Sequence, residues 1–204
     1  MLFDDTYITI ENEAEGIFRD KGSKFIALAY PITNESQVKP IIAKLRAAHP
    51  KARHFCWALR LTPDRSIFRL NDDGEPSGTA GRPILNTILS HELTNILVVV
   101  VRYFGGTLLG VPGLINAYKS ATIDALHQAK RIEKSVNDCY QISFDYLSMN
   151  DVMKTIKEED LVIHAQNFDT NCVIEIEIRQ SKLNHVLARL ESIDTLKTKY
   201  IKTV

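Results

Sequence analysis

The 204-residue sequence lacks the features that mark several special classes of protein. Its only cysteines, Cys56, Cys139 and Cys172, form no Cys-x-x-Cys pair. This spacing argues against a zinc site or a disulfide framework, and free thiols suit a reducing compartment. The longest aliphatic run, residues 96–101, is too short to cross a membrane, and residues 1–5 lack the basic and apolar regions of a signal peptide. We therefore expect a cytoplasmic protein with no zinc and no membrane partner.

The chain also has no net charge, because 25 Lys and Arg balance 25 Asp and Glu. A neutral molecule is no general trap for polyanions. The charges are nevertheless unevenly distributed: residues 1–20 hold six acids and one base, whereas residues 21–119 hold 13 Lys and Arg against six Asp and Glu. The basic middle segment is either a binding surface for an acidic partner or a solvated surface of mixed charge.

Glycine is scarce, with nine residues, but seven of the nine lie between Gly74 and Gly113. They form two glycine runs, residues 71–83 and 102–113. Because glycine loses the most backbone entropy on folding, such crowding indicates unusual dihedral angles or close approach of the backbone to another group. Each run ends where a helix is predicted to begin, and the free N–H groups of a helix start favour anions. We expect the two runs to converge around a pocket lined with amides and arginines.

Periodicity predicts the elements of the first part of the chain. Strands are expected at residues 7–10, 14–19, 23–30, 54–61, 66–70 and 95–101, and helices at residues 34–48, about 79–91 and about 112–130. Residues 95–101 are apolar on both faces, which is typical of a central strand. In 54–61 the large apolar residues alternate with His54, Cys56, Ala58 and Arg60, which predicts one mixed face that is open.

A different pattern follows. Strands are expected at residues 140–147, 161–165, 173–179 and 197–202, and helices at residues 150–159 and 181–192. This β-α-β-β-α-β order is the ferredoxin-like arrangement. We predict two domains, 1–133 and 134–204, separated in the charged stretch 131–135.

The second glycine run combines a strand, a loop and a helix start, which favours a phosphate cradle. The candidate residues are Arg102, Gly105, Gly106 and Gly110, and Arg102 stands at the end of its strand, where open sheets place ligands. However, Val111-Pro112 stands where a P-loop needs Lys-Ser/Thr, and the chain has no G-x-G-x-x-G. The alternative is a tight turn that lets the helix pack closely on the sheet.

The first glycine run is acidic. Its three carboxylates are Asp72, Asp73 and Glu75. Such a cluster can hold Mg²⁺ or act as acid and base, but Asp-Asp-Gly-Glu-Pro is also favourable turn chemistry. Ser77 and Thr79 are support residues and candidate N-caps for the next helix. Arg82, in the first turn of that helix, opposes the helix dipole, which suggests an anionic partner.

Four further residues are candidate contacts for phosphate or bases: Lys21, Lys24, Arg53 and His54. A solvated turn is the alternative for the two lysines. His54 and Cys56 share a strand face, so a Cys–His nucleophile is one hypothesis. The other is a sheet-face histidine beside a buried cysteine.

At these residues the sequence resembles the YigZ/IMPACT family. The matching segments are residues 21–27, 52–58, 71–82 and 99–113 with Ala117-Tyr118, and the resemblance covers about residues 15–130. The C-terminal part is similar to the small ferredoxin-like domain of bacterial members, which resembles the last domain of elongation factor G.

The resemblance implies an α+β protein of two α/β sandwiches. Its N-terminal domain would be of the RNase PH and ribosomal-protein type, with helices on one side of a mainly antiparallel sheet. The resemblance also implies a role around translation, because eukaryotic relatives restrain a starvation-responsive translation kinase by competing for its ribosome-associated activator. No established catalytic activity transfers with the resemblance.

We therefore expect a non-catalytic regulator that binds RNA, the ribosome or a translation factor, and no cofactor. One alternative is an enzyme that uses Mg²⁺ or Mn²⁺ on a phosphorylated or peptide-like substrate, and another is an adaptor that uses the C-terminal surface. The chain departs from the family pattern at Leu108, where a lysine is usual, at Pro112, where a glycine is usual, and at Asn116, where a base is frequent. These departures weaken the expectation of phosphate binding.

Overall fold

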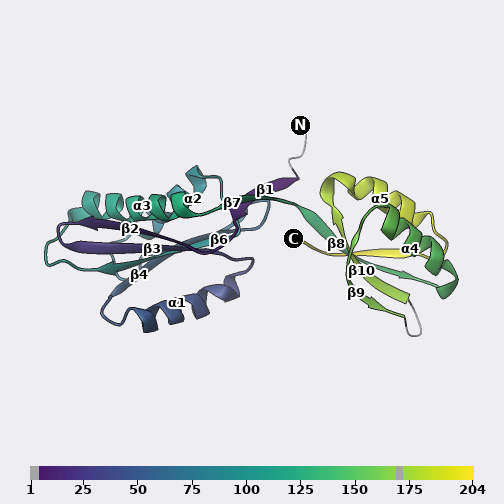
Figure 1. Ribbon diagram of the computed structural model, residues 1–204, viewed down its shortest axis with the longest axis horizontal. Coiled ribbons are helices and arrows are strands. Elements are labelled where there is room, and N and C mark those ends of the chain that lie inside the picture. The colour runs from purple at the N-terminus through teal and green to yellow at the C-terminus, as the bar shows by residue number, and fades with distance from the viewer. Residues whose placement is uncertain (1–4, 169–171) are drawn as a thin grey trace. The chain divides into compact units, whose positions relative to one another are not determined.

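The computed structural model describes residues 5–168 and 172–204, and the chain divides into two compact units (Figure 1). The first unit comprises Tyr7–Lys134. The second comprises Ser135–Val204 together with the described residues before Tyr7. The division lies at residues 134/135, beside the predicted boundary at 133/134, but the described residues before Tyr7 belong with the second unit rather than the first.

The first unit is built on a five-stranded sheet in which every neighbouring pair is antiparallel. In spatial order its strands are β2 (Ala14–Asp20), β3 (Ser23–Pro31), β6 (Ile96–Tyr103), β4 (His54–Leu61) and β5 (Ile67–Asn71). Strand β6 is central and buried along nearly its whole length, as its two apolar faces predicted. A separate pair is formed by β1 (Thr6–Ile10) and β7 (Arg131–Ser135).

Helices cover both faces of this sheet (Figure 1). On one face, α2 (Gly81–Ser90) and α3 (Gly110–Gln128) pack on residues such as Val98 and Val100. On the other face, α1 (Val38–Ala48), preceded by the short 3₁₀ turn Glu35–Gln37, packs on Val99 and Val101. The expectation of helices on one side only was therefore wrong.

The open face predicted for β4 was also wrong. Cys56 and Ala58 are fully buried in the core that includes Ile84 of α2. Their side chains are small, so the helix can approach the strand closely. A mixed composition therefore marked a close helix–sheet contact rather than a solvent-facing surface.

The second unit follows the β-α-β-β-α-β order that the sequence predicted. Its elements are β8 (Asn137–Phe144), α4 (Met149–Glu158), β9 (Val162–Asn167), β10 (Cys172–Arg179), α5 (Leu183–Glu191) and β11 (Lys197–Thr203), with 3₁₀ turns at Tyr146–Ser148 and Gln180–Lys182. The sheet order is β11-β8-β10-β9. In β10, Ile174 and Ile176 point into a core with Val152 of α4 and Leu190 of α5. The alternate residues of β10 therefore lie on the other face of the sheet.

None of the helices in the described residues is long and apolar enough to span a membrane.

Candidate functional site

The two glycine runs meet at a buried ion pair. Arg102 Nη1 lies 2.5 Å from Glu75 Oε1, and the two side chains are 6% and 4% exposed. The same oxygen of Glu75 accepts a hydrogen bond from the hydroxyl of Tyr118 at 2.8 Å. Because a buried charge is costly unless it is paired, this contact ties the loop after β5 to the end of β6.

Asp72 caps α2 from outside the helix. Its Oδ1 accepts hydrogen bonds from the backbone N–H groups of Ala80 at 3.1 Å and Gly81 at 2.8 Å, and its Oδ2 accepts one from Gly78 at 2.9 Å. The helix start is therefore already bound to an anion that the chain itself supplies. The expected caps were wrong: the N-cap residue is Ala80, and the Thr79 hydroxyl donates to the Pro76 carbonyl instead.

Asp73 joins three parts of the first unit. Its carboxylate accepts hydrogen bonds from Arg46 Nη2 at 2.8 Å and from the backbone N–H of Phe55 at 2.7 Å. Its backbone carbonyl accepts a hydrogen bond from His54 Nδ1 at 2.9 Å. Since a carbonyl can only accept, His54 carries its hydrogen on Nδ1, and Nε2 is the acceptor in the neutral ring.

All three carboxylates of the first glycine run thus accept hydrogen bonds within the first unit. A divalent cation at these carboxylates would compete with the arginine, tyrosine and backbone donors that already bind them. Binding of Mg²⁺ by Asp72, Asp73 and Glu75 stays a prediction.

His54 and Cys56 bind other partners rather than each other. The Cys56 thiol donates to the Asp72 carbonyl at 2.9 Å and lies 3.3 Å from the Tyr118 hydroxyl. Burial raises the pKa of the Cys56 thiol well above its usual range, so the thiol stays protonated at neutral pH. This arrangement does not activate a nucleophile. Cys56 instead belongs to a buried series of hydrogen-bonded side chains, Cys56–Tyr118–Glu75–Arg102.

A cavity of about 620 Å³ lies beside the ends of β4 and β6 and is called here the basic pocket. It is lined by Lys51, Arg53, His54, Arg102, Tyr103, Phe104 and Leu108. Lys51 and Arg53 are exposed, and so are Phe104 (55%) and Leu108 (81%). The buried Nε of Arg102 has no hydrogen-bond partner among the described residues. The basic pocket therefore offers positive charge and an accessible aromatic ring in one place.

The glycines of the second run serve the backbone. Gly105 donates its N–H to Ser23 Oγ at 3.1 Å, and a Cβ added to it would lie 1.9 Å from the carbonyl carbon of Gly22. Gly106 and Gly110 have φ values of +89° and +71°, which favour glycine. Gly105 is therefore explained by close approach to the turn between β2 and β3, rather than by the expected close packing of a helix on the sheet. The start of α3 has no side-chain cap and no acidic residue in its first turn.

The remaining predicted contacts are spread over the first unit. Lys24 pairs across the sheet with Tyr103, next to the basic pocket, whereas Lys21 lies in the turn that contains Gly22. Arg82 lines a different pocket, of about 420 Å³, together with Lys119 and other residues of α2 and α3. Arg82 and Arg102 therefore do not share a pocket, because Arg82 projects from the exposed face of α2.

Lys51, Tyr103 and Phe104 of the basic pocket were not marked by the sequence, and Leu108 was noted only as a departure from the family pattern. Lys51 lies in the turn before β4, two positions before Arg53, and this pair of nearby bases was a signal in the sequence. Phe104 directly follows Arg102 and Tyr103, but only its exposure shows that its ring is available.

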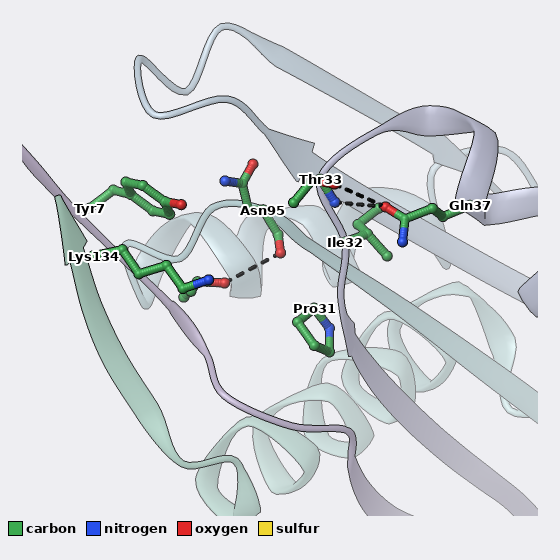
Figure 2. Close-up of a pocket in the computed structure, with 8 residues that line it drawn as sticks. Tyr7, Pro31, Ile32, Thr33, Gln37, Asn95 and Lys134 are labelled. Atoms are coloured by element: carbon green, nitrogen blue, oxygen red, sulfur yellow. Dashed lines mark hydrogen bonds between the residues drawn. The ribbon is translucent and has the colours of Figure 1, made fainter. Parts of the chain in front are cut away.

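Figure 2 shows a smaller pocket of about 90 Å³ in the first unit. There Gln37 Oε1 accepts the backbone N–H of Thr33 at 2.8 Å, and the Thr9 hydroxyl donates to the Asn95 carbonyl at 3.3 Å. Its polar groups largely bind one another and its volume suits a few waters, so it is not a candidate functional site.

Comparison with known proteins finds similar proteins over most of the chain. A family model described as the Impact N-terminal domain matches residues 21–126. The Escherichia coli protein named IMPACT family member YigZ is 30% identical over 172 residues, which is 83% of this chain and 84% of that protein. A crystal structure described as a hypothetical protein is 27% identical, with a TM-score of 0.77, over 97% of this chain and 98% of its own. A structure of the two-domain translational regulator Yih1 is 26% identical over 63% of this chain and 49% of its own, with a TM-score of 0.36.

Proposed function

This chain belongs to the IMPACT family, and from that premise we propose that it is a non-catalytic, cytoplasmic regulator of translation that binds single-stranded RNA of the ribosome through the basic pocket. The family resemblance implies the role around translation. The composition of the basic pocket suggests RNA as the chemical class of the partner.

The observation that carries this proposal is the combination of bases and an exposed aromatic ring in the basic pocket. Lys51 and Arg53 can neutralise phosphates, and counterion release makes such contacts favourable. Phe104, with the Arg102 guanidinium carbon 5.6 Å from its ring centroid, can stack on an unpaired base. Leu108, in place of the lysine usual in the family, adds apolar surface and removes one phosphate contact.

The metal-dependent alternative gains no support from the contacts of Asp72, Asp73 and Glu75, whose oxygens accept hydrogen bonds from the chain's own donors. It predicts heat of Mg²⁺ binding in a calorimetric titration of the wild type and loss of that heat in Asp73→Asn. It is not part of the proposed function.

We further assign the second unit to the ferredoxin-like class. The support is its strand order, β11-β8-β10-β9, with α4 and α5 packed on one face. The RNase PH type of the first unit stays an expectation from the family resemblance.

The test is binding of a single-stranded RNA oligonucleotide, and separately co-sedimentation with ribosomes. The informative variant is Lys51→Ala/Arg53→Ala, and the matched control is Lys39→Ala/Lys44→Ala, which removes the same charge from exposed positions of α1. Arg102 is unsuitable for this purpose because its ion pair with Glu75 holds the fold together.

We expect the pocket variant to bind RNA at least 10-fold more weakly than the control variant. The plot of log K against log salt should become shallower, with a slope smaller in magnitude by roughly 1.4, since each phosphate contact to a single strand contributes about 0.7. Phe104→Ala should weaken binding by about 1–3 kcal/mol, the range for one stacked base. Equal binding by the pocket and control variants would refute the proposed site. Retention on ribosomes without RNA binding would instead indicate a protein partner.

A further inference from the structure

Three metal-ligating side chains gather on the sheet of the second unit. Cys139 on β8, His164 on β9 and Glu177 on β10 come from three neighbouring strands, and their ligand atoms all lie within 4.8 Å of one another. The Nε2 atom of His164 lies 2.6 Å from Glu177 Oε2. None of these residues takes part in the proposed RNA site, which lies in the first unit.

The sheet departs from regular pairing at this place. Cys139 and Glu177 face each other in the register of β8 and β10. In β9 the register with β10 slips at His164, which becomes an extra residue between the paired Ile163 and Ala165. In β11 the register with β8 slips at Ile201 in the same way. A bulge changes the direction of a side chain, so the irregularity at His164 in β9 accounts for the direction of its imidazole toward Glu177.

The cluster is partly enclosed and supported. Cys139 is 4% exposed, and the side chains of Glu177 and His164 are 18% and 46% exposed. The amide of Asn137 donates a hydrogen bond to Glu177 Oε1, while its own Oδ1 is buried without a partner among the described residues. Asn137 thus holds Glu177 through Oε1, as an outer-shell residue holds a metal ligand, and Oε2 lies beside the His164 imidazole.

A cavity of about 290 Å³ gives access to the cluster. It is lined by Cys139, His164, Glu175, Glu177, Ile201, Lys202 and Val204. Lys202 pairs with Cys139 across the strands, and Lys202 and Glu175 bring one charge of each sign to the lining of the cavity. The ligand atoms therefore have a path to solvent.

We propose that Cys139, His164 and Glu177 form a Zn²⁺-binding site. A thiolate, an imidazole and a carboxylate are the ligand types of zinc, whereas Mg²⁺ and Ca²⁺ prefer oxygen alone. The thiolate and the carboxylate neutralise the charge of the ion. Three protein ligands leave a fourth position for water or for a donor group of a partner. The sequence expectation of no zinc rested on local spacing, and these ligands come from three separate strands.

The test uses the full chain, stripped of metal with a chelator and titrated with Co²⁺ and then Zn²⁺. Cobalt bound to Cys139 produces a thiolate-to-cobalt charge-transfer absorption, and stoichiometric Zn²⁺ abolishes it. Cys139→Ser should lose this absorption and bind Zn²⁺ at least about 100-fold more weakly, beyond the effect typical of an outer-shell residue. Asn137→Ala should weaken Zn²⁺ binding by about 10-fold.

The matched control is His185→Gln. His185 and Glu159 also form a His–Glu pair in the second unit, at 3.2 Å, but belong to no Cys-containing ligand cluster among the described residues. This control should keep wild-type Zn²⁺ affinity. Thermal midpoints of the metal-free variants separate loss of the site from loss of folding. The proposal is overturned if the wild type gives no cobalt–thiolate absorption, or if Cys139→Ser keeps it.

Discussion

Glu75 Oε1 and Arg102 Nη1 lie 2.5 Å apart in the core of the first unit, and this pair connects the acidic glycine run to the wall of the basic pocket. The carboxylate holds the guanidinium from one side, while the Phe25 and Phe104 rings lie 5.4 and 5.6 Å from its central carbon. The acidic run thus supports the basic pocket, because it fixes the position of an arginine that would otherwise be free to extend into solvent.

We expect Glu75→Gln to destabilise the protein by about 3–5 kcal/mol, the cost of leaving one member of a buried ion pair without its partner. The free energy of unfolding in urea measures the effect. A double variant, Glu75→Gln/Arg102→Met, removes both charges and should be more stable than the sum of the single changes indicates. Strict additivity would show that the two side chains are not coupled.

Asp72→Ala should lower the free energy of unfolding by at least about 1 kcal/mol, as expected for a lost helix cap. The backbone N–H groups of Ala80 and Gly81 at the start of α2, and that of Gly78 in the loop before it, lose their acceptor. Ser77→Ala is the control, because Ser77 is the exposed residue that local rules favour as a cap. A larger effect at Ser77 than at Asp72 would contradict the capping role.

Gly105→Ala should cost more stability than Gly106→Ala. A Cβ at Gly105 would overlap the backbone of Gly22 and Ser23, so the β2–β3 turn must move, with a cost of about 1–3 kcal/mol or more. A Cβ at Gly106 meets no atom within 4 Å and adds only the strain of its positive φ, about 1–2 kcal/mol. Thermal unfolding of the two variants gives the comparison, and equal costs would argue against the close approach.

Stability in acid should depend on Asp5. Its hydrogen bonds from the Arg179 side chain, at 2.6 Å, and then from Ser181 hold the pKa of the Asp5 carboxyl well below its usual range. A depressed folded-state pKa stabilises the protein above the unfolded value, about 3.9 for aspartate, and this contribution is lost as the pH falls through the lower folded value.

Asp5→Asn should therefore be less stable than the wild type at pH 7, with a smaller difference at pH 2. Denaturant unfolding of both proteins across that range measures the difference. A gap that is constant with pH would mean that the Asp5 charge does not contribute. Asp145→Asn, a change of the same charge at a carboxylate in the same unit, serves as the comparison.

Several local features of the site could be read from the sequence for physical reasons. The second glycine run marked a segment that lines the basic pocket, and the first supplies Glu75, which pairs with Arg102 of that pocket. Glycine favours such segments because the backbone there turns sharply or approaches another chain segment. Arg53, His54 and Arg102 were recognised as candidates and line that pocket. The strand β6 was recognised as central because its residues are apolar on both faces.

The family, the type and order of most helices and strands, and the segments of interest could be read from the sequence, because periodicity and glycine placement act over a few neighbouring residues. The three-dimensional fold was needed to learn which carboxylate caps α2 and which one pairs with Arg102. It was also needed to learn that Arg82 faces another pocket and that Cys139 lies beside His164 and Glu177. These outcomes depend on contacts between residues far apart in the chain. The packing of helices on the sheets and the strand registers set such contacts, and no local pattern records them.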